Sequence, residues 1–182
     1  MSPRPLLLLA LAAAVACSDT QLGDAATANI VDTVTLGAIQ GAALTTPAAF
    51  SITAATPVRT EESSAFDFAY DIIPGKGPVL LPLAALGLGE GGSTNPGLQK
   101  VTTAFDDLKA GPTNGWKQTD TIPIAVGDVI AGRSRIVCYL GVPQYGKFQV
   151  LAFNDVLKTV DLKVLANVNC GYRNLEPGTS RN

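Results

Sequence analysis

Two arginines lie at a spacing that suits the binding of a charged ligand. Arg133 and Arg135 stand two positions apart in a run predicted to be a β-strand, so their side chains project from the same face. A guanidinium holds a carboxylate or a phosphate through two parallel hydrogen bonds. The commoner role for such arginines is to partner acidic side chains on a neighbouring strand. We interpret the two arginines as candidate ligand-binding residues, with acidic partners as the alternative.

Two aromatic residues stand beside predicted turns. Trp116 follows an Asn-Gly dipeptide, and Tyr145 precedes a Gly-Lys dipeptide. An aromatic side chain at such a place can anchor an unknown protein or glycan partner. It can equally pack the turn against the sheet beneath it. Both residues are therefore candidates for ligand binding, and turn packing is the ordinary alternative.

The acidic residues offer the remaining route to catalysis, because the chain contains no histidine, the commonest general base and transition-metal ligand. No Ser-x-x-Lys motif is present to activate a serine. Asp67 and Asp71 share a strand face but lie ~13 Å apart along it, too far for an acid/base pair, which favours a solvated sheet face. A glycan-active enzyme would need Asp67, Asp71, Asp106 or Asp107 to converge across strands.

The charge pattern and the remaining motifs exclude several other functions. The formal net charge is −2, from 13 Lys+Arg and 15 Asp+Glu spread along the chain without blocks, which indicates no nucleic-acid partner. The glycine-rich stretch 90–97 lacks the residues of a phosphate-binding loop. Glu61-Glu62 and Asp106-Asp107 lack the ligand spacing of a calcium loop. We predict no cofactor and no metal site.

Residues 1–16 have the three-part layout of a secretory signal peptide. Arg4 supplies a positive charge, an apolar run follows, and an Ala-Val-Ala sequence precedes Cys17. The apolar run from Leu6 to Ala16 has 11 residues. A membrane-spanning helix needs about 20. The sequence therefore predicts a signal that is removed on export.

The Ala-Val-Ala-Cys sequence at 14–17 resembles the lipobox of bacterial lipoproteins, in which the cysteine carries a thioether-linked diacylglycerol. That family prefers Leu where this chain has Ala14, and an ordinary signal peptidase would also cut after Ala-x-Ala. Acylation of Cys17 leaves Cys138 and Cys170 as an even pair in an oxidising compartment. We predict that acyl chains such as palmitate on Cys17 hold the protein on the membrane. A residue other than Asp after the cysteine implies the outer membrane of the cell envelope under the enterobacterial sorting rule.

The mature chain is predicted to form one all-β domain. Residues 17–28 form a flexible tether, 29–174 the domain and 175–182 a disordered tail. Stretches 83–88 and 98–108 are ambiguous between a short helix and a strand. Pro78 and Pro82 favour an edge or a bulge for the strand that they flank. Apolar runs or period-two alternation predict strands at 33–38, 50–54, 64–72, 79–83, 122–126, 129–140, 148–153 and 157–168. Seven or more short strands without βαβ alternation indicate an antiparallel β-sandwich or barrel.

The two later cysteines are predicted to form a disulfide. Cys138 lies near the end of the predicted strand 129–140, and Cys170 lies just past the end of 157–168. A bridge would close a loop of roughly 32 residues and contribute ~3.5 kcal/mol to stability in the chain-entropy model. Two separate buried thiols are the alternative.

Three stretches resemble HmuY-type β-sandwich lipoproteins. Residues 126–135 followed by 145–150 resemble the late hairpin of that family, and 65–70 resembles its earlier acidic-aromatic strand. The resemblance implies a β-sandwich fold. The haem ligation of that family, through paired histidines, has no counterpart in this sequence.

These observations favour a non-enzymatic envelope protein. It would bind an extracellular ligand or partner, or contribute structurally to an envelope assembly. A carboxylate-dependent glycan-active enzyme and a subunit of an extracellular filament or complex are the alternatives. Fold alone does not decide among them.

Overall fold

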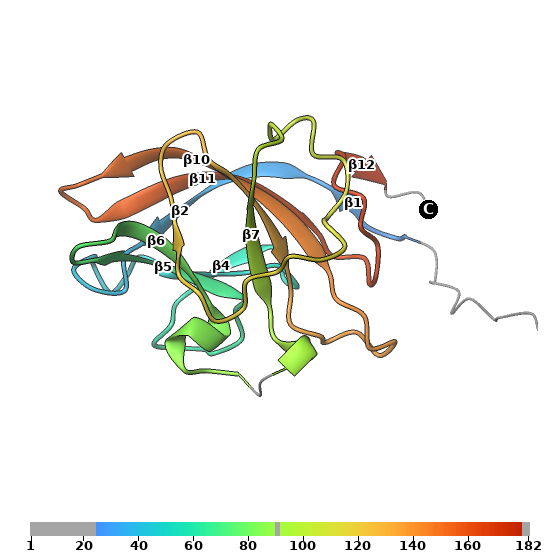
Figure 1. Cartoon of the computed structure of the whole chain (residues 1–182), viewed down its shortest axis with the longest axis horizontal. Coiled ribbons are helices and arrows are strands. Elements are labelled where there is room, and N and C mark those ends of the chain that lie inside the picture. Colours follow the sequence, from blue (N-terminus) through green and yellow to red (C-terminus); the bar gives the residue numbers. More distant parts are fainter. Residues whose placement is uncertain (1–24, 90–91, 180–182) are drawn as a thin grey trace, which may run out of the picture.

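The computed structural model describes residues 25–89 and 92–179. Two five-stranded antiparallel sheets pack face to face, and a two-stranded ribbon lies at one end (Figure 1). This arrangement confirms the predicted all-β sandwich of seven or more strands. The predicted signal peptide and Cys17 lie outside the described residues.

The first sheet has the strand order β2-β11-β10-β9-β7, and the second has the order β4-β3-β5-β6-β8. The first comprises β2 (Val31–Gly37), β11 (Thr159–Asn167), β10 (Tyr145–Asn154), β9 (Val129–Arg133) and β7 (Gly97–Val101). The second comprises β4 (Thr56–Val58), β3 (Ala49–Ser51), β5 (Phe68–Ile73), β6 (Gly77–Pro82) and β8 (Ile122–Pro123). The ribbon pairs β1 (Ala28–Asn29) with β12 (Gly178–Thr179). Two short 3-10 helices, η1 (Leu83–Leu86) and η2 (Gly92–Thr94), follow β6.

The core lies between the two sheets, where apolar residues at alternate strand positions meet. The ring of Phe148 on β10 meets Phe50 and Phe68 of the second sheet edge-on, with centroids 5.4 and 4.8 Å away. The ring leaves no space for a side chain at Gly132 on β9, where a Cβ atom would lie 2.8 Å from it. Tight packing of this kind makes the period-two pattern visible in the sequence.

The outer face of the first sheet is also covered. The loop after β7 and the segment after β11 bring Phe105, Leu108 and Leu175 onto Ala131 and Leu165. The ambiguous stretch 98–108 is therefore a strand only as far as Val101, and it continues as a loop that packs on the sheet.

Several strand predictions are wrong in detail: β5 begins at Phe68, β8 ends at Pro123 and β3 ends at Ser51, and two further differences bear on the site and the second sheet. The strand predicted at 129–140 ends at Arg133, because the backbone turns away from β10: the Arg135 N–H donates to Asp67 Oδ1 (2.8 Å) and the Ile136 N–H to the Thr94 carbonyl (3.3 Å). The strand β6 lies inside the second sheet, although its prolines favoured an edge or a bulge. It tolerates them because β8 is only two residues long and pairs with Val79 and Leu80 alone.

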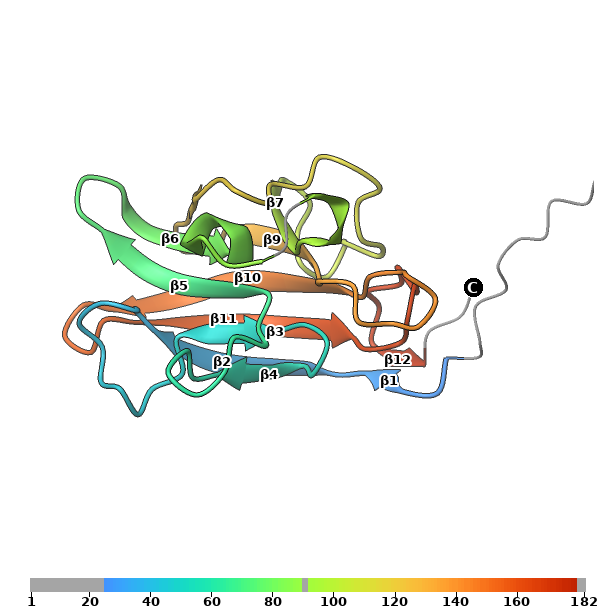
Figure 2. The same cartoon turned by 90° about the horizontal axis from the view of Figure 1, so that it is seen from below.

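The ordered domain extends beyond both predicted boundaries. The predicted tether reaches residue 28, but the backbone N–H groups of Ala26 and Thr27 both donate to Asn169 Oδ1 at 3.0 Å. The predicted tail begins at residue 175, but Leu175 is fully buried and β12 pairs with β1. The two ends of the chain hold each other in place at the same end of the sandwich (Figure 2). No helix in the described part of the chain is long and apolar enough to cross a bilayer.

Candidate functional site

A cavity of about 340 Å³ opens beside η1 and η2, the light green turns on one side of the sandwich in Figure 1. Among the described residues, Arg135 is the only charged residue that lines it. The other lining residues are Leu83, Leu88, Pro96 and Ile136, which are apolar, together with Ser64, Gly89, Thr94 and Asn95. A single cation among apolar and small polar groups is the composition of a small-molecule site.

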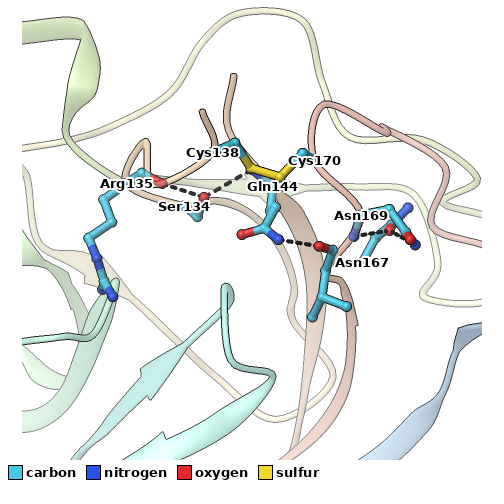
Figure 3. Close-up of a disulfide and its surroundings, with 8 residues drawn as sticks. Ser134, Arg135, Cys138, Gln144, Asn167, Asn169 and Cys170 are labelled. Carbon is cyan, nitrogen blue, oxygen red and sulfur yellow. Dashed lines mark hydrogen bonds between the residues drawn. A yellow bond between two sulfur atoms is a disulfide. The ribbon is translucent and has the colours of Figure 1, made fainter. Parts of the chain in front are cut away.

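The backbone of Arg135 is fixed on both sides. Its N–H donates to Asp67 Oδ1 at 2.8 Å, and its carbonyl accepts the Ser134 hydroxyl at 2.6 Å. The next N–H, of Ile136, donates to the Thr94 carbonyl at 3.3 Å. These bonds fix the backbone from which the Arg135 side chain extends. Figure 3 shows that this side chain is directed away from the disulfide.

Asp67 supports this arginine from a buried position. Its side chain is 1% exposed, and Oδ2 accepts the Ile52 N–H at 2.6 Å. Its Oδ1 lies 3.7 Å from Arg135 Nη1, a long ion-pair distance. Burial raises the pKa of Asp67, and the N–H and the charge of Arg135 only partly oppose that effect.

The predicted solvated face for Asp67 and Asp71 is therefore wrong. Both residues are buried, and Asp71 accepts the Gln40 N–H at 3.2 Å. The outer face of the second sheet is covered near Asp67 by Phe66 and Leu83, which pack with Ala69. Period-two alternation identifies which residues leave the core, but not whether another segment covers them.

The guanidinium of Arg135 retains hydrogen-bonding capacity. Nη1 is buried yet has no hydrogen-bond partner among the described residues. The side chain is 24% exposed. Both oxygens of Asp67 already accept backbone N–H groups. The contact between the two side chains is thus the 3.7 Å ion pair and not a hydrogen bond, so Nη1 keeps its capacity to donate to another acceptor.

Arg133 occupies a different position from Arg135. Its guanidinium lies 5.8 Å from the centroid of the Trp116 ring, and Nη2 donates to the Asn95 carbonyl at 3.1 Å. Gln118 donates to the same carbonyl at 3.0 Å. Because Asn95 lines the cavity, Arg133 supports its wall from behind. The two arginines do not share a strand face, since β9 ends between them, but the expectation of an acidic partner holds for Arg135.

Trp116 and Tyr145 lie together, away from the cavity lining. Their ring centroids are 6.0 Å apart, and both pack against the cluster that includes Phe105 and Leu108. A Cβ atom at Gly111 would lie 2.7 Å from the Tyr145 ring, so the chain passes directly over it. This geometry fits the turn-packing alternative. Of the four predicted ligand-binding residues, Arg135 alone lines the cavity.

The predicted disulfide is present between Cys138 and Cys170, with Cα atoms 5.9 Å apart. It joins the loop that follows Arg135 to the segment after β11 (Figure 3). Within the loop, the Gln144 N–H donates to the Ser134 hydroxyl at 2.9 Å, and the Gln144 side-chain amide donates to the Val168 carbonyl. The disulfide thus closes the loop that has Arg135 at its base.

The acidic residues named for catalysis are dispersed. Asp67 lies behind Arg135, whereas Asp106 pairs with Lys163 of β11 at 2.9 Å on the exposed surface of the first sheet. Within residues 25–89 and 92–179, no three His, Cys, Asp or Glu side chains are grouped as metal ligands.

Comparison of the chain with family models, curated proteins and solved structures found no match. Its function is therefore argued from the cavity and its residues.

Proposed function

We propose that the protein is an exported bacterial lipoprotein, held in the cell envelope through Cys17, whose domain binds a small carboxylate-bearing molecule in the Arg135 cavity. On this proposal it is a binding protein and not an enzyme. The signal layout and the lipobox-like sequence at 14–17 support the anchor. The bridge between Cys138 and Cys170 supports it further, because it leaves Cys17 as the one cysteine available for lipid.

The observation that carries the binding proposal is that Nη1 of Arg135, at the wall of the cavity, is buried without a hydrogen-bond partner among the described residues. Leaving a buried charged donor without a hydrogen bond costs free energy, so a ligand oxygen that completes the bonding of this guanidinium is favoured. The cavity of about 340 Å³ is at the lower end of the size range of ligand pockets.

The charges favour a monocarboxylate over a phosphate ester. Asp67 already compensates part of the charge of Arg135, and no second cation from residues 25–89 or 92–179 lines the cavity. A phosphate ester carries up to two negative charges, whereas a carboxylate carries one and matches the fork of the guanidinium. The apolar wall of Leu83, Leu88 and Ile136 suits a short hydrocarbon body.

Isothermal titration of the folded domain tests this proposal. The ligands are straight-chain monocarboxylates of four to eight carbons, with a phosphate monoester of similar size for comparison. Arg135→Gln should weaken carboxylate binding at least tenfold, since a charge-assisted pair contributes about 1.5–3 kcal/mol. Arg59→Gln is the matched control, because Arg59 lies in another loop and pairs with Glu62 on the surface. Absence of binding by every ligand, or equal binding by the two variants, would overturn the proposal.

A further inference from the structure

We infer that the loop 136–144, closed by the Cys138–Cys170 bridge, is a second membrane contact that inserts Tyr139 and Val137 into the interfacial layer of the bilayer. This inference rests on the proposed lipid anchor. It concerns Val137 and Tyr139, which do not line the Arg135 cavity.

The loop is apolar for a surface segment. None of its nine residues, Ile-Val-Cys-Tyr-Leu-Gly-Val-Pro-Gln, is charged. Tyr139 is 87% exposed and Val137 is 55% exposed. Tyrosine is enriched at the membrane–water interface, where its ring is buried while its hydroxyl stays hydrated.

The loop is held in one conformation before it meets any partner. The disulfide fixes its middle, and the Gly171 N–H donates to the Pro143 carbonyl at 3.0 Å. The Gly141 N–H donates to the Cys138 carbonyl at 2.9 Å and closes the turn that carries Tyr139. A preorganised loop loses little conformational entropy on binding, so a few apolar side chains suffice for a contact.

The loop also lies where the chain leaves the domain toward Cys17. Asn169 accepts the N–H groups of Ala26 and Thr27, and the next residue, Cys170, is bonded to Cys138 in the loop. Cys17 precedes Ala25, the first described residue, by eight positions. Eight residues span at most about 29 Å, so a lipid on Cys17 keeps this end of the domain near the bilayer.

The opposite end of the sandwich provides a matched comparison. The turn between β10 and β11 lies at the end away from β1 and β12 in both views (Figure 1, Figure 2). Val156 in this turn is 89% exposed, as open to solvent as Tyr139. The same turn carries the charged residues Asp155 and Lys158, which disfavour burial in lipid. Exposure alone therefore does not distinguish the two sites, but distance from the anchor and local charge do.

A tryptophan placed at each site reports on contact with lipid. Tyr139→Trp and Val156→Trp are made separately in the Trp116→Phe background, so that each protein has one tryptophan. The full chain is expressed with its signal, purified and reconstituted into phosphatidylethanolamine/phosphatidylglycerol vesicles with or without brominated acyl chains. We expect the emission of the Tyr139→Trp protein to shift to the blue and to fall at least twofold with brominated lipid. The emission of the Val156→Trp protein should not change. Equal quenching of the two proteins, or no quenching of either, would overturn the membrane contact.

Mass spectrometry of the same samples separates this inference from the anchor. If Cys17 carries lipid and the Tyr139→Trp protein is not quenched, the anchor stands and the loop contact is wrong. If Cys17 carries no lipid, the proposed anchor fails. The Tyr139→Trp protein mixed with excess vesicles then decides the loop alone, and quenching supports the contact whereas its absence refutes it. Circular dichroism of each variant confirms that the sandwich is intact.

Discussion

Arg135 and Lys147 are both long cationic side chains held inside the protein, and they differ in how completely they are bonded. Lys147 of β10 is 1% exposed, and its Nζ donates to the carbonyls of Phe105 (2.6 Å) and Leu108 (3.2 Å). The ring of Phe105 lies 4.5 Å from the same Nζ and closes the remaining side. Arg135 has its long ion pair with Asp67, an unbonded Nη1 and a cavity in front of it.

The difference shows how to separate a structural cation from a binding one. Burial lowers the pKa of Lys147, yet the protein supplies acceptors and an aromatic face for it, so its role is to hold the loop after β7 on the sheet. Arg135 is less buried and less satisfied. Incomplete bonding next to a cavity is therefore a better sign of a ligand site than burial or a shifted pKa.

The largest expected effect comes from removing the disulfide. The bridge ties down the loop that follows Arg135 and does not support Lys147. The bridge spans 32 residues, and the double variant Cys138→Ala/Cys170→Ala should lose about 3.5 kcal/mol of unfolding free energy. Carboxylate binding should weaken as well, because the loop with Arg135 at its base loses its tie. Denaturant titration measures the loss, and reductant should destabilise only the wild type. A double variant as stable as the wild type would show that the bridge is dispensable.

The next largest effect is expected from replacing Lys147. Lys147→Met keeps the apolar stem but leaves two buried carbonyls without their donor, so we expect a loss of about 2–3 kcal/mol. Carboxylate binding should be unchanged in the fraction that remains folded. Lys163→Met is the control, since Lys163 faces the same Phe105 ring at 4.4 Å but lies nearer the surface, where its ion pair contributes at most about 1 kcal/mol. Equal losses in the two variants would contradict a special role for Lys147.

The buried carboxyl of Asp67 makes the stability of the protein depend on pH. The pKa of its carboxyl is raised in the folded protein, so between the unfolded value of 3.8 and the folded value the native state binds more protons. Its contribution to stability is therefore greatest below that window and falls as pH rises through it. Asp67→Asn should abolish this slope and cost about 1–2 kcal/mol, because an amide cannot accept both N–H groups without turning a donor toward one of them. Denaturant titrations at pH 3.5 to 7 measure both effects, and an identical pH profile in the variant would refute the assignment.

Tyr70 gives the smallest expected effect. Its hydroxyl is buried and has no hydrogen-bond partner among the described residues, and burial, aided by Asp155 and Asp71, raises its pKa to about 12. Tyr70→Phe should leave the unfolding free energy within about 0.5 kcal/mol of the wild type or raise it. It should also remove a fall in stability between the ordinary tyrosine pKa of 10.0 and about 12, a window in which the folded state keeps a proton that the unfolded state loses. A loss above 1 kcal/mol, the scale of a net hydrogen bond, would mean that the hydroxyl is bonded after all.

The sequence predicted the sandwich and the disulfide because both leave local signals. Alternating apolar residues in β5 and β11 mark a face against the core, and an even cysteine pair after a predicted signal peptide indicates a bridge. The cavity left no such signal. It is assembled from Ser64, the start of η1, Asn95 and Arg135, and their approach depends on how β9 ends and how the loops fold over the second sheet.

The role of Asp67 was missed for a related reason. A strand pattern predicts which way a side chain leaves the sheet, and Asp67 does leave the core face. Asp67 is covered by η1 and by the chain after β9. This cover depends on contacts between residues far apart in sequence, such as the hydrogen bond from the Arg135 N–H to Asp67. The sequence named both Arg133 and Arg135 as candidate ligand-binding residues. It did not predict that only Arg135 would line the cavity.

A crystal structure of the domain grown with a saturating straight-chain monocarboxylate of four to eight carbons tests the central claim most directly. We predict both carboxylate oxygens within about 3.2 Å of the Arg135 guanidinium nitrogens. The hydrocarbon chain should lie against Leu83, Leu88 and Ile136, and Asp67 should stay bonded to the Arg135 and Ile52 N–H groups. A cavity that holds only water at saturating carboxylate, or a carboxylate bound away from Arg135, would contradict the account.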